Sequence, residues 1–395
     1  MGDFSVEQRT GHSNRSKPKE IHASPDNYRL APWSPLRHPF HTVSSICLLL
    51  PLLALQGVGE ADAPEIYANG RLRWESTYNQ PDGTDRHRAR MRARLGARYA
   101  FQDDFRIEGR LSTASDGNDA NTPYWDFGDG SDGFNGADIT LDRYFLTWYG
   151  DYDLEVHAGK QPHIFDGPTI IEVFLWDDDV QPSGLTSVCA GGDEEVQWDV
   201  RGAAYVAVEA GSGHDATIVG AQANLHLGSD ELDWHLGSSF HGWGGLGGFG
   251  GTLDNQGNTD VTGDFQIWDT FLNLSSNTGP MGGWEAFAQY YNNTATGTED
   301  TGFAFGSRLG KGRNRGDANL FLVYYDLDAD AVFSPVAQND TPIAGTGLGT
   351  GMRGVFAGVQ YYFRDGMGLR LWVINSDTDT ADPYRIRLDL DFTIR

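Results

Sequence analysis

The segment RHRARMRARLGARYAF, residues 86–101, contains six arginines, all at even residue numbers. A guanidinium group keeps its positive charge at any physiological pH and binds carboxylates and phosphates through paired hydrogen bonds. A row of such groups could bind a polyanion, or it could form one charged face of a sheet. Which of the two applies depends on the element that carries the row, because the element sets the direction of each side chain.

The spacing of these arginines predicts a strand. Residues two apart on a helix point about 200° apart, so the row would scatter around a helix axis, whereas on a strand every second side chain shares one face. The other face of the strand would then be apolar. Its residues are Ala89, Met91, Ala93, Leu95, Ala97, Tyr99 and Phe101.

The composition limits the choice of partner and of fold. The chain has 395 residues, with 29 Lys and Arg against 55 Asp and Glu, for a formal net charge of −26. This acidic balance argues against nucleic acid as a partner. With 51 Gly and 12% aromatic residues, the chain has the composition of many short strands and turns. The two cysteines, Cys47 and Cys189, make a disulfide framework improbable.

Alternation of apolar and polar residues recurs along the chain. Several alternating segments run for about 9–12 residues, the length that a tilted membrane strand requires, whereas strands of soluble proteins average about 5–6. The connections 102–104 and 149–153 are short, and those at 116–138 and 162–196 are long. Short turns at one end and long loops at the other are typical of outer-membrane barrels.

We therefore predict an all-β fold, a transmembrane antiparallel β-barrel of about 16 strands over residues 64–395. Strand parity requires either one more strand between Pro162 and Gly192 than the clear segments supply, or that one of these segments is a loop. Residues 169–176 and 184–190 are the two candidates for the additional strand.

The first 63 residues are predicted to be an N-terminal extension with a signal peptide. Its apolar core spans 46–55, after Arg37, His38 and His41, and Ala61-Asp62-Ala63 gives an A-x-A cleavage pattern. A buried helix is the alternative. Export would place the barrel in the outer membrane.

In such a barrel the arginine face must point into the lumen, because an Arg facing lipid costs about 2–4 kcal/mol at the midplane. Closure places the last strand beside the first and so extends the wall. The predicted pore-lining residues are Arg71, Arg73, Arg88, Arg90, Arg92, Arg94, Arg98, Arg106, Arg110, Arg385 and Arg387.

The connection after Lys160 is predicted to be the third external loop, the one that folds inward in many porins. Its acidic residues are Asp166, Glu172, Asp177, Asp178 and Asp179. We expect a constriction with arginines on one side and these carboxylates on the other, whose field favours solutes with an anionic group. The alternative is that the ion pairs only hold the loop in place.

The segments RARLGARYAFQDDFRIEGRLST, DITLDRYFLTWYG, AGKQPHIF and LWDDDVQPSGL resemble the "Putative porin" family of Gram-negative outer membranes, over about residues 66–190. The resemblance implies a passive channel for small hydrophilic solutes, surrounded by outer-membrane lipid, without a catalytic set or a cofactor. Trimers are common among porins, so a homotrimer is one expectation.

Two other functions and one metal remain open. An exported β-rich protein could bind carbohydrate through its Trp and Asp residues, and a barrel enzyme would need a Ser, His and acid set that we cannot assemble. The segment 116–138 is rich in Asp, Asn and Gly, like a calcium-binding loop, but it lacks the EF-hand spacing and final Glu. A solvated acidic loop is the alternative to structural calcium there.

Overall fold

A computed structural model of the chain describes residues 63–80, 83–114, 122–127, 138–170, 174–210, 214–229, 231–248, 255, 257–337, 350–377 and 382–394. Most of the N-terminal extension, including the predicted signal peptide core, lies outside these ranges. Most of the acidic segment 116–138 lies outside them as well. In the described ranges, no helix has the length and apolar character needed to cross a membrane.

The described strands form one antiparallel sheet, with two short 3-10 turns, η1 (Leu246–Gly248) and η2 (Pro280–Gly282). In chain order the strands are β1 (Glu65–Tyr78), β2 (Arg86–Phe101), β3 (Phe105–Ala114), β4 (Thr122–Phe127), β5 (Asp138–Tyr149), β6 (Leu154–Lys160), β7 (Ser183–Gly192), β8 (Val196–Val208), β9 (Ala216–Leu227), β10 (Asp233–Gly244), β11 (Phe265–Ser276), β12 (Trp284–Asn293), β13 (Thr301–Leu309), β14 (Ala318–Leu327), β15 (Met352–Arg364), β16 (Met367–Asp377) and β17 (Tyr384–Ile394).

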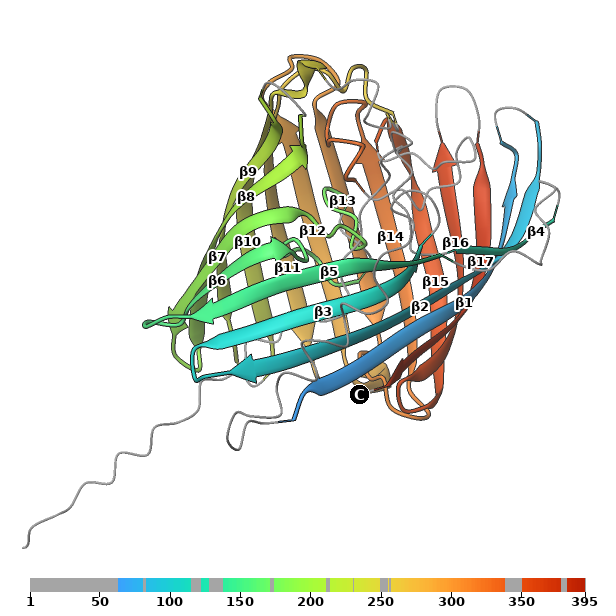
Figure 1. The fold of residues 1–395 in the computed structure, drawn as a ribbon. Coiled ribbons are helices and arrows are strands. Elements are labelled where there is room, and N and C mark those ends of the chain that lie inside the picture. Colours follow the sequence, from blue (N-terminus) through green and yellow to red (C-terminus); the bar gives the residue numbers. More distant parts are fainter. Residues whose placement is uncertain are drawn as a thin grey trace, which may run out of the picture.

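The sheet closes into a barrel because the last strand pairs with the first (Figure 1). β17 lies antiparallel to β1, with Leu390 opposite Leu72. β3 and β4 share one position in the sheet, since β3 pairs with Arg94–Phe101 of β2 and β4 pairs with His87–Met91 of the same strand. The barrel therefore has 16 strand positions, which confirms the predicted fold class.

The additional strand that parity required is β7, at the second of the two predicted places. The first place, 169–176, is not a strand in its described residues, 169–170 and 174–176. The segment 86–101, predicted to be a strand, is β2 with the same bounds.

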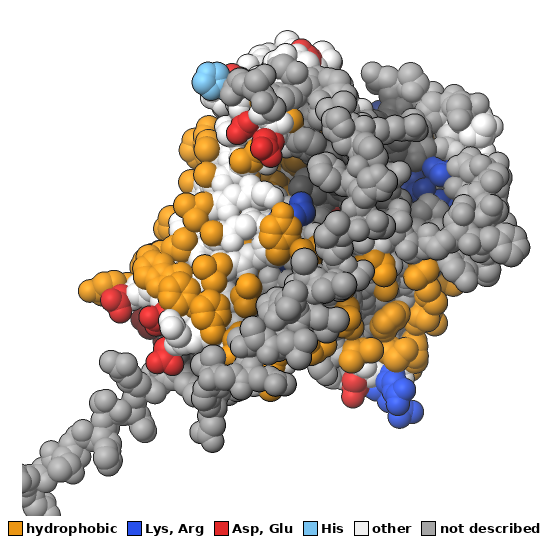
Figure 2. Space-filling model, viewed as in Figure 1, with side chains coloured by type: hydrophobic (Ala, Val, Ile, Leu, Met, Phe, Trp, Pro, Cys, Tyr) orange, Lys and Arg blue, Asp and Glu red, His pale blue; other side chains and the backbone are white. Residues whose placement is uncertain are grey.

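Side chains alternate between an apolar outer face and a buried inner face. Leu72 and Trp74 of β1 are 52% and 42% exposed, whereas Arg73 and Glu75 are 2% and 1% exposed. Figure 2, viewed as in Figure 1, shows apolar side chains gathered over the outer surface where strands β6 to β9 lie, which are green in Figure 1, with acidic side chains near the ends of these strands. This outer surface has the character of a lipid-facing band.

The connections have different lengths at the two ends of the barrel. Because antiparallel strands alternate in direction, every second connection lies at the same end. At one end most turns are short, at 102–104, 150–153, 193–195, 228–232 and 365–366, and two are longer, at 277–283 and 310–317. At the other end the connections are longer, at 161–182, 245–264 and 328–351.

Two of the long connections bury aromatic side chains against inner-face residues. In the connection 161–182, Phe165 packs on His241 of β10 with ring centres 4.3 Å apart. In the connection after β14, Phe333 packs on Trp243 of β10 at 5.5 Å. These contacts belong to a hydrophobic core inside the barrel, on the side of β8 to β16.

Candidate functional site

The arginines predicted to line the pore all lie on inward-facing positions of β1, β2, β3 and β17. The partly buried ones are Arg88, Arg92, Arg98 and Arg106. The fully buried ones are Arg71, Arg73, Arg90, Arg94, Arg110, Arg385 and Arg387. We refer to these eleven residues as the arginine wall.

The register between β1 and β17 places opposite charges face to face. The oppositely charged pairs are Arg71–Asp391, Arg73–Asp389 and Glu75–Arg387, and Arg385 faces the hydroxyl-bearing Thr77. Opposite charges directly across an antiparallel pair stabilise it. The sequences RLRWES and RIRLDLD are therefore complementary at the seam where the barrel closes.

The register between β1 and β2 does the reverse and brings arginines together. The facing pairs are Asn69–Arg94, Arg71–Arg92, Arg73–Arg90 and Glu75–Arg88. Like charges directly opposite each other are destabilising, so this pair of strands depends on carboxylates supplied from elsewhere. β1 thus lies between an acidic neighbour and a basic one.

Asp389 of β17 is the central carboxylate of the wall and is 0% exposed. Arg73 Nε donates to its Oδ1 at 2.8 Å, while Arg370 Nη2 and Trp372 Nε1 each donate to its Oδ2 at 3.1 Å. Arg71 Nε lies 3.9 Å from Oδ2. The carboxylate of Asp389 therefore contacts three arginines, and the Trp372 indole fixes the orientation of this carboxylate.

Two further carboxylates are shared in the same way. Glu75 of β1 accepts from Arg88 Nε and, at 2.8 Å, from Arg387 Nε. Glu75 is 1% exposed, so both ion pairs are shielded from solvent. A charge-assisted hydrogen bond in such a setting is stronger than one in water.

Glu108 of β3 forms the third shared site. It accepts hydrogen bonds from Arg98 Nε at 2.8 Å, from Arg143 Nη1 at 2.8 Å and from the Tyr67 hydroxyl at 2.7 Å. Side chains of β1, β2 and β5 therefore converge on one buried carboxylate of β3.

Sequence reasoning missed Arg143 and Asp142 of β5. Asp142 accepts from Arg110 Nη2 at 2.6 Å, and Arg143 is 4% exposed. A register irregularity between Arg110 and Leu111, where β5 pairs with β3, shifts the phase of the alternation. After the irregularity, Tyr144 and every second residue that follows it face outward. This alternation was the signal that could have placed Arg143 on the inner face.

Asp179 brings the connection 161–182 into contact with the arginine wall. Its Oδ1 forms an ion pair with Arg94 and lies 3.7 Å from Arg92 Nη1. Nearby, Arg143 Nε donates to Gln181 Oε1 at 3.0 Å. At this point the acidic loop and the wall touch directly, and no gap separates them.

The other acidic residues of this connection have different positions. Asp166 Oδ2 accepts from Arg201 Nη2 of β8 at 2.6 Å, away from the wall. Asp177 and Asp178 are each 4% exposed. Glu172 lies outside the described residues. The predicted set of loop carboxylates is therefore divided between two parts of the barrel interior.

Trp176 anchors the connection against β10. Its ring stacks on His163 with centres 5.4 Å apart and lies 6.0 Å from Trp243, and its Nε1 donates to His241 Nδ1 at 3.2 Å. Burial in this packing lowers the pKa of His163 to about 3, and the charge of Arg201 acts in the same direction. His163 is therefore neutral at physiological pH.

Further along, Phe174 packs between β14 and β15. Its ring centre lies 4.9 Å from Tyr325 and 5.9 Å from Phe356. The backbone N–H of Asp177 donates to the carbonyl of Val336 at 2.8 Å, which joins the two long connections. Part of the interior is thus filled by packed loops, and the polar wall occupies the rest.

The described residues contain one group with the composition of a metal site, made of Asp166, His226 and His235. The acidic segment 116–138 predicted as a calcium loop lies mostly outside the described residues, so calcium there stays a prediction.

A comparison with protein families agrees with the sequence interpretation. Residues 56–205 match the model of a family described as "Putative porin". The range includes β1 to β7 and most of β8, so the predicted resemblance is confirmed over the strands that carry most of the arginine wall. No curated protein matches the chain.

Solved structures share the barrel. The high-pH structure of OprB from Pseudomonas putida matches with a TM-score of 0.55 and 12% identity, over 84% of this chain and 94% of its own. OmpF of Salmonella typhi, solved with daunomycin, matches with a TM-score of 0.49 and 12% identity, over 85% of this chain and 99% of its own. At such low identity the likeness to OprB shows the fold and nothing further.

Proposed function

We propose that the chain, which matches the "Putative porin" family over residues 56–205 and folds as a closed barrel, is a porin that lies in the outer membrane of a Gram-negative bacterium and passes small hydrophilic solutes by diffusion. We further propose that the arginine wall gives the channel a preference for anions. The channel acts without a catalytic step, in this proposal, and the barrel is embedded in outer-membrane lipid.

The sharing of carboxylates is the observation that supports an anion preference. Asp389 serves three arginines, and Glu75 and Glu108 serve two each. Among the described residues, the eleven arginines of the wall outnumber the seven carboxylates that form ion pairs with them, which are Glu65, Glu75, Glu108, Asp142, Asp179, Asp389 and Asp391. A lumen wall with excess positive charge lowers the energy of an anion beside it and raises that of a cation.

The test is single-channel recording of the purified barrel in a planar bilayer. We expect stepwise conductance, and a reversal potential in a salt gradient that shows anion preference. Replacing Arg90, Arg92 and Arg94 together with Ser should move the reversal potential toward cation preference, because the wall loses positive charge at the place where the loop approaches it.

Arg353→Ser is the matched control. Arg353 lies on the outer face of β15 with its side chain 60% exposed, paired with Asp377. Its loss should leave the reversal potential unchanged. Folded protein without any conductance would reject the channel, and an unchanged reversal potential in the triple variant would reject the role of the wall.

Location and assembly have separate tests. Separation of bacterial membranes by density should place the protein with the outer membrane, and heat-modifiable gel mobility should report the closed barrel. Native mass spectrometry in detergent tests a homotrimer, which we include in the proposal. Recovery in the soluble periplasmic fraction would favour the carbohydrate-binding alternative.

A further inference from the structure

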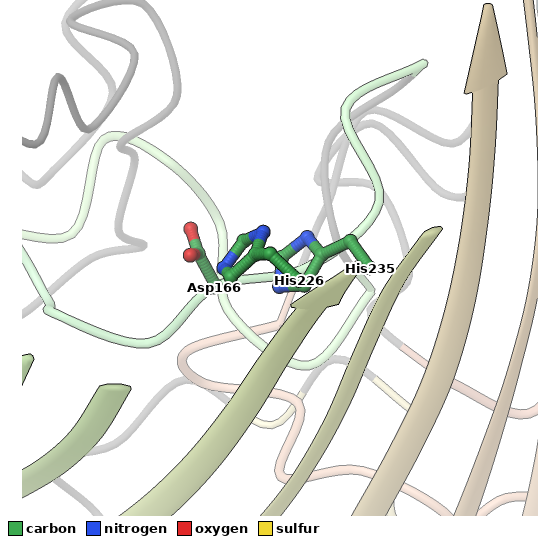
Figure 3. A group of neighbouring side chains, drawn as sticks. All are labelled: Asp166, His226 and His235. Carbon is green, nitrogen blue, oxygen red and sulfur yellow. The ribbon is translucent and has the colours of Figure 1, made fainter. Parts of the chain in front are cut away.

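Two histidines face each other across neighbouring strands at the short-turn end of the barrel. His226 of β9 and His235 of β10 are register partners, and their rings stack with centres 3.9 Å apart (Figure 3). Both are only partly buried and lie in phase with the inner faces of their strands. The pair thus presents ring nitrogens toward the interior, beside the turn 228–232.

Asp166 brings a carboxylate to the same place from the connection 161–182. Its backbone N–H donates to Gln222 Oε1 at 2.7 Å, and Gln222 Nε2 donates to its carbonyl at 2.9 Å. These two hydrogen bonds fix Asp166 against β9. In Figure 3 its carboxylate lies beside the His226 ring, and one ligand atom from each of the three residues lies within 4.8 Å of the others.

A second carboxylate supports the group from outside. Asp199 Oδ2 lies 3.6 Å from His226 Nε2, and Arg201 holds both acids, with Nε on Asp199 Oδ1 and Nη2 on Asp166 Oδ2. A histidine that binds a metal through one nitrogen commonly offers the other to a carboxylate, which fixes its tautomer. Arg201 engages Oδ2 of Asp166, and Oδ1 is the oxygen that can turn toward the histidines.

The Nε2 atom of His235 has no hydrogen-bond partner among the described residues. This atom is also buried. A buried polar atom without a partner costs about 1–3 kcal/mol, so binding at this nitrogen would recover free energy.

The group is open to solutes. His226 and His235 line a cavity of about 430 Å³ at this end of the barrel, together with the acidic residues Glu194, Glu195 and Asp233. The negative charges of the lining attract cations into the cavity, although Arg308 and Lys311 on its other side oppose them.

We propose that His226, His235 and Asp166 form a binding site for a divalent transition-metal ion, with Zn²⁺ as the representative case. Imidazole nitrogens suit Zn, Cu, Fe and Ni, and two imidazoles with one carboxylate leave further positions for water. Two ligand atoms on one tetrahedral Zn²⁺ lie about 3.3 Å apart, since each bond is about 2.0–2.1 Å long. The three ligand atoms lie within 4.8 Å of one another here, and small rotations of the partly exposed side chains would bring them to the shorter separation.

The experiment measures Zn²⁺ binding to the full, folded barrel, purified without a polyhistidine tag, by isothermal titration calorimetry. We expect one saturable site per chain. His226→Gln and His235→Gln should each weaken binding more than about tenfold, since even the loss of a supporting outer residue costs about 10–100-fold. The double variant should lose the site.

His214→Gln is the matched control, because His214 is exposed near the opposite end of the barrel, before β9. It should bind Zn²⁺ as the unaltered chain does. Heat-modifiable mobility and conductance without Zn²⁺ show that each variant has folded and still conducts. The proposal is overturned if the folded barrel binds no Zn²⁺ saturably, or if the double variant binds it unchanged.

This outcome is independent of the channel proposal. A barrel that conducts without a Zn²⁺ site keeps the proposed function, and a barrel with the site but no conductance keeps the metal site.

Discussion

The two parts of the barrel interior are buried to a similar degree but are held together by different means. Arg73 and Asp389 in the arginine wall, and Trp176 and Phe333 in the aromatic packing, are all at most 2% exposed. In the wall, the partners lie opposite each other on neighbouring strands, so the register of the sheet sets their positions. In the packing, one partner of each contact comes from a long connection.

This difference has a consequence for rigidity. A contact between paired strands breaks only when the sheet opens, whereas a loop can leave its site while the barrel stays closed. Segments whose contacts can open separately have lower local stability than the whole fold. The wall should therefore be as stable as the barrel, and the packed loops should be its adjustable part.

The largest effect is expected where a shared carboxylate of the wall is removed. Asp389→Asn removes the carboxylate that Arg73 binds and one of the two that Arg71 and Arg370 share, since both also pair with Asp391. Breaking a buried ion pair costs about 3–5 kcal/mol. Equilibrium unfolding in urea should show this loss in the free energy of unfolding of the barrel.

Asp377→Asn is the control for that variant. Asp377 pairs with Arg353 at 2.8 Å on the exposed surface, where an ion pair contributes about 0–1 kcal/mol. Equal losses in the two variants would mean that the wall is not a rigid buried network.

A smaller change in stability and a larger one in conductance are expected from Trp176→Ala. In an ordinary core this substitution costs about 3–5 kcal/mol. Here the connection can unpack while the barrel stays closed, so the free energy of unfolding should fall by less, and single-channel conductance should rise.

Trp268→Ala is the matched control, since Trp268 lies on the outer face of β11 and is 50% exposed. Its conductance should equal that of the unaltered chain. The opposite result would be a fall of about 3–5 kcal/mol in the free energy of unfolding of Trp176→Ala without any change in conductance. It would mean that the loop and the wall unfold together as one rigid unit.

Asp179→Asn tests the contact between the two parts. A hydrogen bond to a charged group contributes about 1.5–3 kcal/mol, so a loss in this range is expected. Arg94 and Arg92 then lose the loop carboxylate, and the reversal potential should move further toward anion preference.

A double-mutant cycle with Arg94→Ser measures the coupling between Asp179 and Arg94 directly. Additive effects on stability would show that the loop and the wall are independent of each other.

The smallest effect is expected from pH. His163 has an ordinary pKa of 6.5 that burial lowers to about 3 in the folded protein. The unpacked loop therefore binds a proton more readily, so packing is fully stable above about pH 6.5 and weakens as the pH falls toward 3.

Tryptophan fluorescence of the intact barrel between pH 7 and pH 4 should show this weakening. The variant His163→Phe keeps the stacking on Trp176 but cannot be protonated, and it should lose the pH dependence that His163 contributes. The same profile in both proteins would assign the pH dependence to other groups.

Most of the arginine wall was predictable from the sequence, because side chains on a strand alternate between the two faces with a period of two residues. This period placed the arginines of β1, β2, β3 and β17 on inner faces and bounded β2 correctly. It missed Arg143 because a bulge shifts the phase within β5, and a strict period cannot show where a residue is inserted.

The aromatic packing and the metal group were not predictable in this way. Trp176 and Phe333 lie in connections, where no period relates one residue to the next. Asp166 reaches His226 only after the connection folds against β9, although 60 residues of chain separate the two positions. Contacts of this kind depend on the closed barrel, and the sequence of either segment alone does not contain them.

The charge order along the closing seam also selects how the barrel can be assembled. If β17 slipped by two residues in one direction along β1, Arg387 would come to lie opposite Arg73; in the other direction, Asp389 would come to lie opposite Glu75. A slip by one residue would turn the charged face of β17 toward lipid. Each neighbouring alignment thus brings like charges together or exposes charge to the bilayer. The charges of the first and last strands therefore favour the observed register over its neighbours, in addition to the backbone pairing.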